Sequence, residues 1–234
     1  MRHRAAWCKA GWGPYRYKLK LRAVNLACLG WILGFVAILP AGSALAVPVV
    51  IVALGDSLTA GTGLDGPEAA FPARLEAALA AVGVDAVVHN AGVAGDTSAA
   101  GLARLDWSLV DGTDLVIVEL GANDALRGLD PAVTHTNLDI IVGTLRERGI
   151  GVLLAGMLAP PNLGKEYGDE FRAAFEATTA AHDVTFYPFF LDGVVAELNY
   201  LQRDGMHPNA AGVEVIVERI LPTVQQAILA LHAK

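Results

Sequence analysis

The stretch VVIVALGDSL at residues 49–58 decides the fold, because a continuous apolar run ends there in a Gly-Asp-Ser turn. An apolar run without alternation is expected of a strand that is covered on both faces, as in a parallel sheet. Gly55 allows the chain to bend, and Ser57 then follows directly at the end of the strand. In an open parallel sheet, ligands bind beyond this carboxyl edge. The segment therefore predicts a buried strand that presents the Ser57 hydroxyl group at the edge of the sheet.

On either side of this segment, short β-branched runs alternate with longer Ala-rich stretches, which is typical of β/α units around a parallel sheet. We expect five strands, at residues 49–54, 86–89, 115–120, 151–155 and 184–187. We expect five main helices, at residues 71–82, 97–107, 132–148, 165–181 and 209–232. No repeat or linker divides this part of the chain. The sequence thus predicts a single α/β domain, a flavodoxin-like three-layer α/β/α sandwich with a mostly parallel five-stranded sheet.

Residues 1–46 differ in character from the rest and are predicted to form a signal peptide. A basic stretch without any acidic residue precedes an apolar run from Ala23 to Leu39. Ala44-Leu45-Ala46 then has the small-x-small pattern of a cleavage site before Val47. The alternative is an uncleaved anchor helix, because the apolar run lies at the short limit of a membrane span. We therefore expect an exported protein, periplasmic or secreted.

Removal of the leader would leave residues 47–234 as an acidic domain without cysteine. The leader carries seven of the 17 basic residues and none of the 24 acidic residues, so the formal charge would change from −7 to −14. Such a surface repels phosphate backbones, so we expect no nucleic-acid partner and no binding to an anionic membrane surface. Since the apolar run leaves with the leader, we also expect no stable membrane insertion after cleavage. Cys8 and Cys28 would also leave, which excludes a disulfide or a thiolate site in the domain. Asn25 disfavours lipid attachment at Cys28.

Polar residues that can perform nucleophilic chemistry follow several of the expected strands. Asp204 and His207 lie three residues apart in the loop DGMHP, so the carboxylate can orient the imidazole as a general base toward Ser57. Asn123 follows the LVIVEL strand, and Gly95 follows the strand before it. With the Ser57 N–H, these two residues could form an oxyanion hole. Each segment alone is an ordinary turn or helix cap, but their conjunction predicts an active site.

This set of motifs resembles the SGNH, or GDSL, hydrolase family, over nearly all of residues 49–229. The segments ALGDSLTAG, NAGVAGDTSAAGLARL, VIVELGANDALRG and DGMHPN are most similar to its periplasmic multifunctional thioesterase I/lysophospholipase/arylesterase group. The resemblance implies that Ser57 is the nucleophile, His207 the base and Asp204 the catalytic acid residue. It also implies that Gly95 and Asn123 donate to the oxyanion together with Ser57.

The activity implied is that of a carboxylic ester hydrolase that works through an acyl-serine intermediate. Its substrate would be a small-molecule acyl ester or thioester, such as an arylester, a lysophospholipid or an acyl-thioester. Two alternatives stay open, a carbohydrate O-acetylesterase and a non-catalytic lipid-binding domain. The acyl-chain length, the leaving group and the oligomeric state are not determined by the sequence.

Two loops are expected to shape an acyl pocket by the same resemblance. Residues 160–164 would form one wall, and residues 126–129 would form a flap beside Asn123. Leu158, Leu163 and Phe189 are candidates for its apolar lining.

We expect neither a cofactor nor a metal ion. The segment GTGLDG at residues 61–66 matches the dinucleotide-binding fingerprint, but it begins six residues after Gly55 rather than at the end of the strand. We interpret it as a loop. The widely spaced His89, His135 and His182 are interpreted as strand-end or helix-surface residues, and Asp124 is assigned a structural role.

Overall fold

The computed structural model describes residues 47–195 and 197–231. The predicted signal peptide, with both cysteines, lies outside the described residues. A single five-stranded sheet runs through the described chain, with every strand parallel to its neighbours and the order β2-β1-β3-β4-β5. The strands are β1 (Val49–Gly55), β2 (Ala86–Gly92), β3 (Leu115–Glu119), β4 (Gly151–Ala155) and β5 (Thr185–Tyr187).

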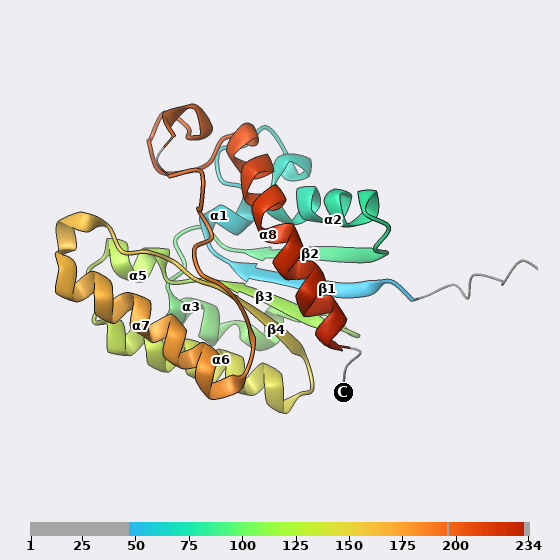
Figure 1. The fold of residues 1–234 in the computed structure, drawn as a ribbon, viewed down its shortest axis with the longest axis horizontal. Coiled ribbons are helices and arrows are strands. Elements are labelled where there is room, and N and C mark those ends of the chain that lie inside the picture. Colours follow the sequence, from blue (N-terminus) through green and yellow to red (C-terminus); the bar gives the residue numbers. More distant parts are fainter. Residues whose placement is uncertain (1–46, 196, 232–234) are drawn as a thin grey trace, which may run out of the picture. The chain divides into compact units, whose positions relative to one another are not determined.

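Helices cover both faces of this sheet and complete a three-layer sandwich (Figure 1). One layer contains α2 (Phe71–Ala81) and α8 (Ala210–Leu231), which pack against each other and on the sheet. The opposite layer contains α3 (Ser98–Ala103), α6 (Pro131–Glu147) and α7 (Lys165–His182). The shorter elements are α1 (Ser57–Ala60), α4 (Leu105–Ser108), α5 (Ala122–Leu126) and single 3₁₀ turns at Pro67–Ala69, Pro161–Leu163 and Leu198–Tyr200. The expected fold class is confirmed.

The core lies on both faces of the three central strands. Every residue of β3 and β4 is buried, as are the last five residues of β1. Aromatic side chains also pack on both sides of the sheet. The ring centroids of Phe71 and Phe190 lie 5.0 Å apart in an edge-to-face arrangement, and those of Phe171 and Phe175 lie 5.3 Å apart. Burial of each such side chain contributes roughly 1.5–3 kcal/mol to folding. The continuous apolar character of these strands therefore follows from their position between two helical layers.

One expected helix is divided in the structure. The helix expected at residues 97–107 breaks at Arg104, where α3 ends and α4 begins. The guanidinium group of Arg104 donates to the carbonyl oxygen of Gly55 at 2.8 Å and to Asp96 at 2.6 Å. The break lies at the residue that makes these long-range contacts.

The strand order creates a switch point beside β1. The strands β2 and β3 lie on opposite sides of β1. The loops that follow the carboxyl ends of these strands therefore diverge from one another. Crevices for ligands form at such a point in open α/β sheets. Ser57, Gly95 and Asn123 all follow strands that end there.

Among the described helices, none combines the length and the apolar character that crossing a bilayer requires.

Candidate active site

Ser57 is presented by a tight turn between β1 and α1. Asp56 caps α1, and its Oδ1 accepts a hydrogen bond from the N–H of Leu58 at 3.0 Å. Gly55 lies beneath this turn, where a Cβ atom would come within 2.6 Å of a carboxyl oxygen of Glu119. Only glycine therefore fits at the end of the strand, and the partly exposed Ser57 is the first residue of the helix.

The Asp204–His207 loop brings its two side chains to Ser57. The carboxylate of Asp204 accepts hydrogen bonds from the backbone N–H groups of Met206 (2.9 Å) and His207 (3.0 Å). Its second oxygen lies 2.6 Å from His207 Nδ1, and His207 Nε2 lies 2.9 Å from Ser57 Oγ. Since a carboxylate only accepts, Nδ1 carries the proton and Nε2 is free to accept the Ser57 hydroxyl proton.

Hydrogen bonds keep this carboxylate ionised. The bond from His207, followed by the two backbone N–H groups, lowers the pKa of Asp204 to about 2. The carboxylate is therefore charged at every pH at which the imidazole could act as a base. Its negative charge favours the imidazolium that proton transfer from Ser57 would create.

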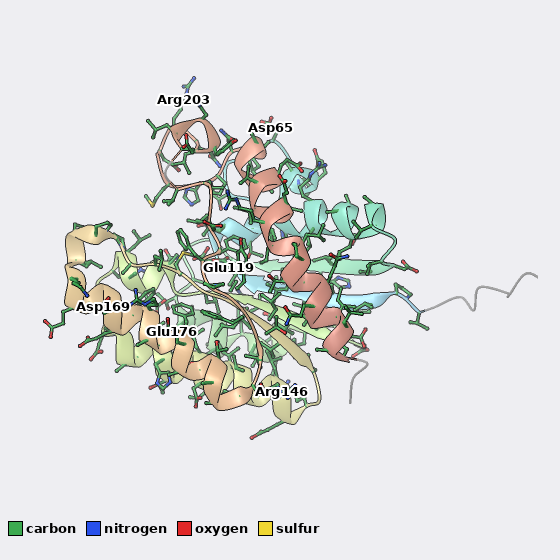
Figure 2. The ribbon with its side chains drawn as sticks, in the orientation of Figure 1. Asp65, Glu119, Arg146, Asp169, Glu176 and Arg203 are labelled. Carbon is green, nitrogen blue, oxygen red and sulfur yellow. The ribbon has the colours of Figure 1, made fainter. Side chains whose placement is uncertain are left out.

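Backbone contacts attach this loop to the domain. Gln202 N donates to His207 O at 2.8 Å, and a bridge pairs Leu201 with Pro208. The side-chain amide of Gln202 donates to the carbonyl oxygens of Thr62 and Pro208. Figure 2 shows the loop projecting from the sandwich, with Arg203 at its tip. These contacts position His207 although most of the loop is exposed.

The expected oxyanion donors lie at the same site, but Asn123 is engaged elsewhere. Among the described residues, the backbone N–H groups of Ser57 and Gly95 donate to no acceptor. Asn123 Nδ2 donates to Asp56 Oδ2 at 2.9 Å and to the carbonyl oxygen of Asp96 at 3.0 Å. Both amide hydrogens are therefore used within the protein. An oxyanion would receive the third hydrogen bond only if Asn123 shared or released one of these contacts.

Two arginines hold the segment that contains Gly95. Gly95 has a left-handed backbone conformation with φ +85°, which glycine adopts readily. Arg127 donates to its carbonyl oxygen at 2.7 Å. Arg104 links Asp96 to the end of β1 through the contacts described above. The two backbone donors are thus fixed relative to each other.

Buried carboxyl groups lie beneath the nucleophile. Asp56 and Glu119 are both fully buried. Burial raises the pKa of Asp56 to about 6, although hydrogen bonds from Leu58 and Asn123 oppose this shift. Burial, and next the neighbouring Asp56 charge, raise the pKa of Glu119 well above its ordinary value. Sequence reasoning did not assign Glu119 to the site, although a lone acidic residue in the apolar run VIVEL was a signal for it.

A largely apolar cavity of about 820 Å³ opens beside these groups, and Ser57, Gly95, Asn123 and His207 line it. Much of its apolar wall comes from Leu126, Met157, Leu158, Pro160, Phe189 and Val195. Of the candidates for the lining, Leu158 and Phe189 do line the cavity, whereas Leu163 does not. Pockets for small ligands have this size and this mixture of apolar walls with few polar groups.

The remaining candidates lie outside the cavity. Within residues 47–195 and 197–231, no group of three or more His, Cys, Asp or Glu side chains is arranged to hold a metal ion. His182 pairs with Asp139 at 2.7 Å and joins α7 to α6. Asp124 is buried and accepts hydrogen bonds from the backbone N–H and the hydroxyl of Ser98, at 2.7 and 2.5 Å. It thereby connects the start of α3 to α5.

The fold and the Ser–His–Asp contacts have the geometry of a serine hydrolase. Comparison with known proteins supports this class. Residues 53–215 match the GDSL-like Lipase/Acylhydrolase family. The chain belongs to this family.

Individual relatives cover most of the described chain. The protein is 40% identical to Esterase TesA of Pseudomonas aeruginosa, over 75% of this chain and 87% of the relative. It is 35% identical to Thioesterase 1/protease 1/lysophospholipase L1 of Escherichia coli, over 75% of this chain and 83% of the relative. The crystal structure of AlinE4, an SGNH-hydrolase family esterase, superposes with a TM-score of 0.65 at 46% identity, over 77% of this chain and 97% of that chain.

Proposed function

We propose that this protein hydrolyses carboxylic esters and thioesters of apolar acyl groups, with Ser57 as the nucleophile. The observation that carries the proposal is the continuous hydrogen-bonded chain from Ser57 through His207 to Asp204 at the wall of a large apolar cavity. Relatives named as an esterase and as a thioesterase/lysophospholipase support the same reaction class.

The proposed reaction follows these contacts step by step. Ser57 Oγ attacks the carbonyl carbon while His207 Nε2 accepts the hydroxyl proton and Asp204 stabilises the imidazolium. The N–H groups of Ser57 and Gly95 donate to the oxyanion, and Asn123 adds a third donor once it turns from Asp56 or Asp96. His207 then protonates the leaving group, and an acyl group remains on Ser57. His207 then accepts a proton from a water molecule, which attacks the acyl group. The carboxylic acid leaves, and His207 returns the proton to Ser57 Oγ.

The shape of the site supports an acyl chain rather than a sugar as the bulky part of the substrate. The cavity wall is formed largely by aliphatic and aromatic side chains, and its few polar groups gather around Ser57. A chain of several methylene groups gains about 0.8 kcal/mol for each CH₂ that it buries. The acyl group is therefore expected to lie in the cavity, with the leaving group toward the opening.

The test is hydrolysis of p-nitrophenyl esters over a series of acyl lengths, with Ser57→Ala as the paired variant. We expect turnover to extend to medium or long chains and to fall by a factor of roughly 10³–10⁶ in the variant, because the nucleophile is removed. Turnover confined to acetyl esters would support a carbohydrate O-acetylesterase. No turnover, together with failure of Ser57 to react with a fluorophosphonate, would support a lipid-binding domain.

We also propose that residues 1–46 are an export signal and that the domain begins at Val47. Support comes from the basic stretch, the apolar run and the Ala44-Leu45-Ala46 pattern. The enzyme would then act outside the cytoplasmic membrane, in a periplasm or as a secreted protein. N-terminal sequencing of the exported protein tests this, and any start other than Val47 would contradict the proposed cleavage site.

A further inference from the structure

Glu119 lies at the end of β3, directly beneath the turn that carries Ser57. Its side chain is 0% exposed, and Figure 2 shows it in the middle of the fold. Its Oε2 accepts hydrogen bonds from the hydroxyl of Thr59 at 2.8 Å and from the N–H of Asp56 at 3.4 Å. Its Oε1 is buried and has no hydrogen-bond partner among the described residues. The contacts of Glu119 are thus made with the two residues that flank the Ser57–Leu58 pair.

No described cation neutralises this carboxyl group. None of the ion pairs found in residues 47–195 and 197–231 involves Glu119. Arg104 is engaged with Asp96 and the Gly55 carbonyl oxygen, and His207 faces Ser57. The charged group that faces Glu119 is a second buried carboxyl, that of Asp56. Two adjacent carboxylates cannot both stay ionised in a buried site without a large cost.

The hydrogen bonds indicate which of the two carries the proton. Asp56 accepts at both oxygens, from the Leu58 N–H and from the Asn123 amide, and these bonds favour its ionised form. Glu119 accepts at one oxygen only, and one of its two bonds is long. A proton on Glu119 also removes the repulsion that would act on Asp56. The raised pKa of Glu119 agrees with this assignment.

We propose that Glu119 is a positioning residue whose neutral carboxyl group holds the nucleophile turn through Asp56 and Thr59, and leaves Asp56 ionised to hold Asn123. Gly55 fits this arrangement, because a Cβ atom there would come within 2.1 Å of Thr59 Oγ1 and displace both partners. A charged Glu119 would add a second negative charge to that of Asp56 beneath the forming oxyanion and raise the energy of the transition state. The catalytic consequence rests on the proposed role of Ser57.

The kinetic test compares Glu119→Gln with Glu119→Met in ester hydrolysis by the full chain. Glutamine keeps a neutral acceptor, so we expect kcat to stay within about threefold of the parent. Methionine fills the space but accepts no comparable hydrogen bond, so we expect kcat to fall roughly tenfold or more with KM nearly unchanged. A glutamine variant as impaired as the methionine variant would show that the charge is needed. A fully active methionine variant would show that Glu119 does not position the turn.

An infrared measurement tests the proton itself and needs no activity. At neutral pH, the difference spectrum between the parent and Glu119→Gln should show the loss of a protonated carboxylic acid C=O band. The matched control is Glu76→Gln, because Glu76 is a half-buried carboxylate that accepts from the Val88 N–H at 2.7 Å, away from the site. That control should lose a carboxylate band instead. Loss of a carboxylate band in Glu119→Gln would overturn the proposal, whether or not Ser57 is the nucleophile.

Discussion

In the proposed reaction, Asp204 acts only through His207, and its three hydrogen bonds determine how. Asparagine at this position would present an NH₂ or a neutral oxygen to Nδ1, so the tautomer with a free Nε2 would no longer be favoured. We therefore expect Asp204→Asn to lower kcat by on the order of 10²- to 10⁴-fold. Steady-state hydrolysis of a p-nitrophenyl ester between pH 5 and 9 measures this. A variant that keeps more than a tenth of the parent kcat would contradict the role of Asp204.

The stability of the same variant should depend on pH with a defined sign. The pKa of Asp204 is lowered from 3.8 to about 2 in the folded protein, so its contacts stabilise the fold above pH 3.8 and are lost as the pH falls through about 2. The difference in the free energy of unfolding between the parent and Asp204→Asn should shrink as the pH falls below 4. Urea unfolding at each pH provides the values, and a difference that grows on acidification would be inconsistent with the lowered pKa.

At the scale of elements, the position of α1 depends on its contact with β2. α1 has four residues, and a helix this short has little stability of its own. A Cβ atom at Gly92, the last residue of β2, would come within 2.3 Å of the backbone nitrogen of Ala60. The close approach of two backbones thus sets the position of the helix that begins with Ser57.

Gly92→Ala should therefore weaken both the fold and the site. Neither backbone can move without displacing its neighbours, so we expect the free energy of unfolding to fall by about 1–3 kcal/mol and kcat to fall as well. The matched control is Gly168→Ala in α7, where an added Cβ meets no atom within 4 Å. That change should raise stability by roughly 0.5–1 kcal/mol, because alanine favours a helix. Urea unfolding distinguishes the two, and equal effects would disprove the packing argument.

At the scale of the whole molecule, the core is built between the first strand and the last helix. Buried side chains range from Ile51 in β1 to Ile228 in α8, and they form one cluster around the sheet. A chain of this length buries enough apolar surface to fold without a disulfide or a metal. The described contacts of the site also lie between Gly55 and Pro208.

A chain that begins at Val47 should thus fold and act by itself. We expect a single cooperative unfolding transition and the same kcat and KM as the full-length protein, because the described core and site lie C-terminal to that residue. Calorimetry and ester hydrolysis of the two chains, purified in the same detergent-free buffer, make the comparison. An insoluble or inactive shorter chain would show that residues before Val47 are part of the folded unit.

The sequence by itself determined the five strands, most of the main helices and the order of the polar segments. The strands β1, β3 and β4 were predictable because continuous apolar runs are expected of strands that are covered on both faces. The position of Ser57 at the end of a strand was predictable because a Gly-Asp-Ser turn follows the first of these runs. These are local properties of the chain. Helix boundaries agreed closely where the pattern was long, as in α6, and failed at Arg104, whose partners are distant in sequence.

Only the tertiary structure decided which groups meet. Ser57 and His207 are 150 residues apart, and their 2.9 Å contact depends on the sheet order and on the bonds that attach the His207 loop. It also engaged Asn123 with Asp56 and, among the described residues, left Glu119 Oε1 without a hydrogen-bond partner. Such contacts depend on which side chains the strand register brings together and how they are oriented there, and neither has a signature in local sequence periodicity.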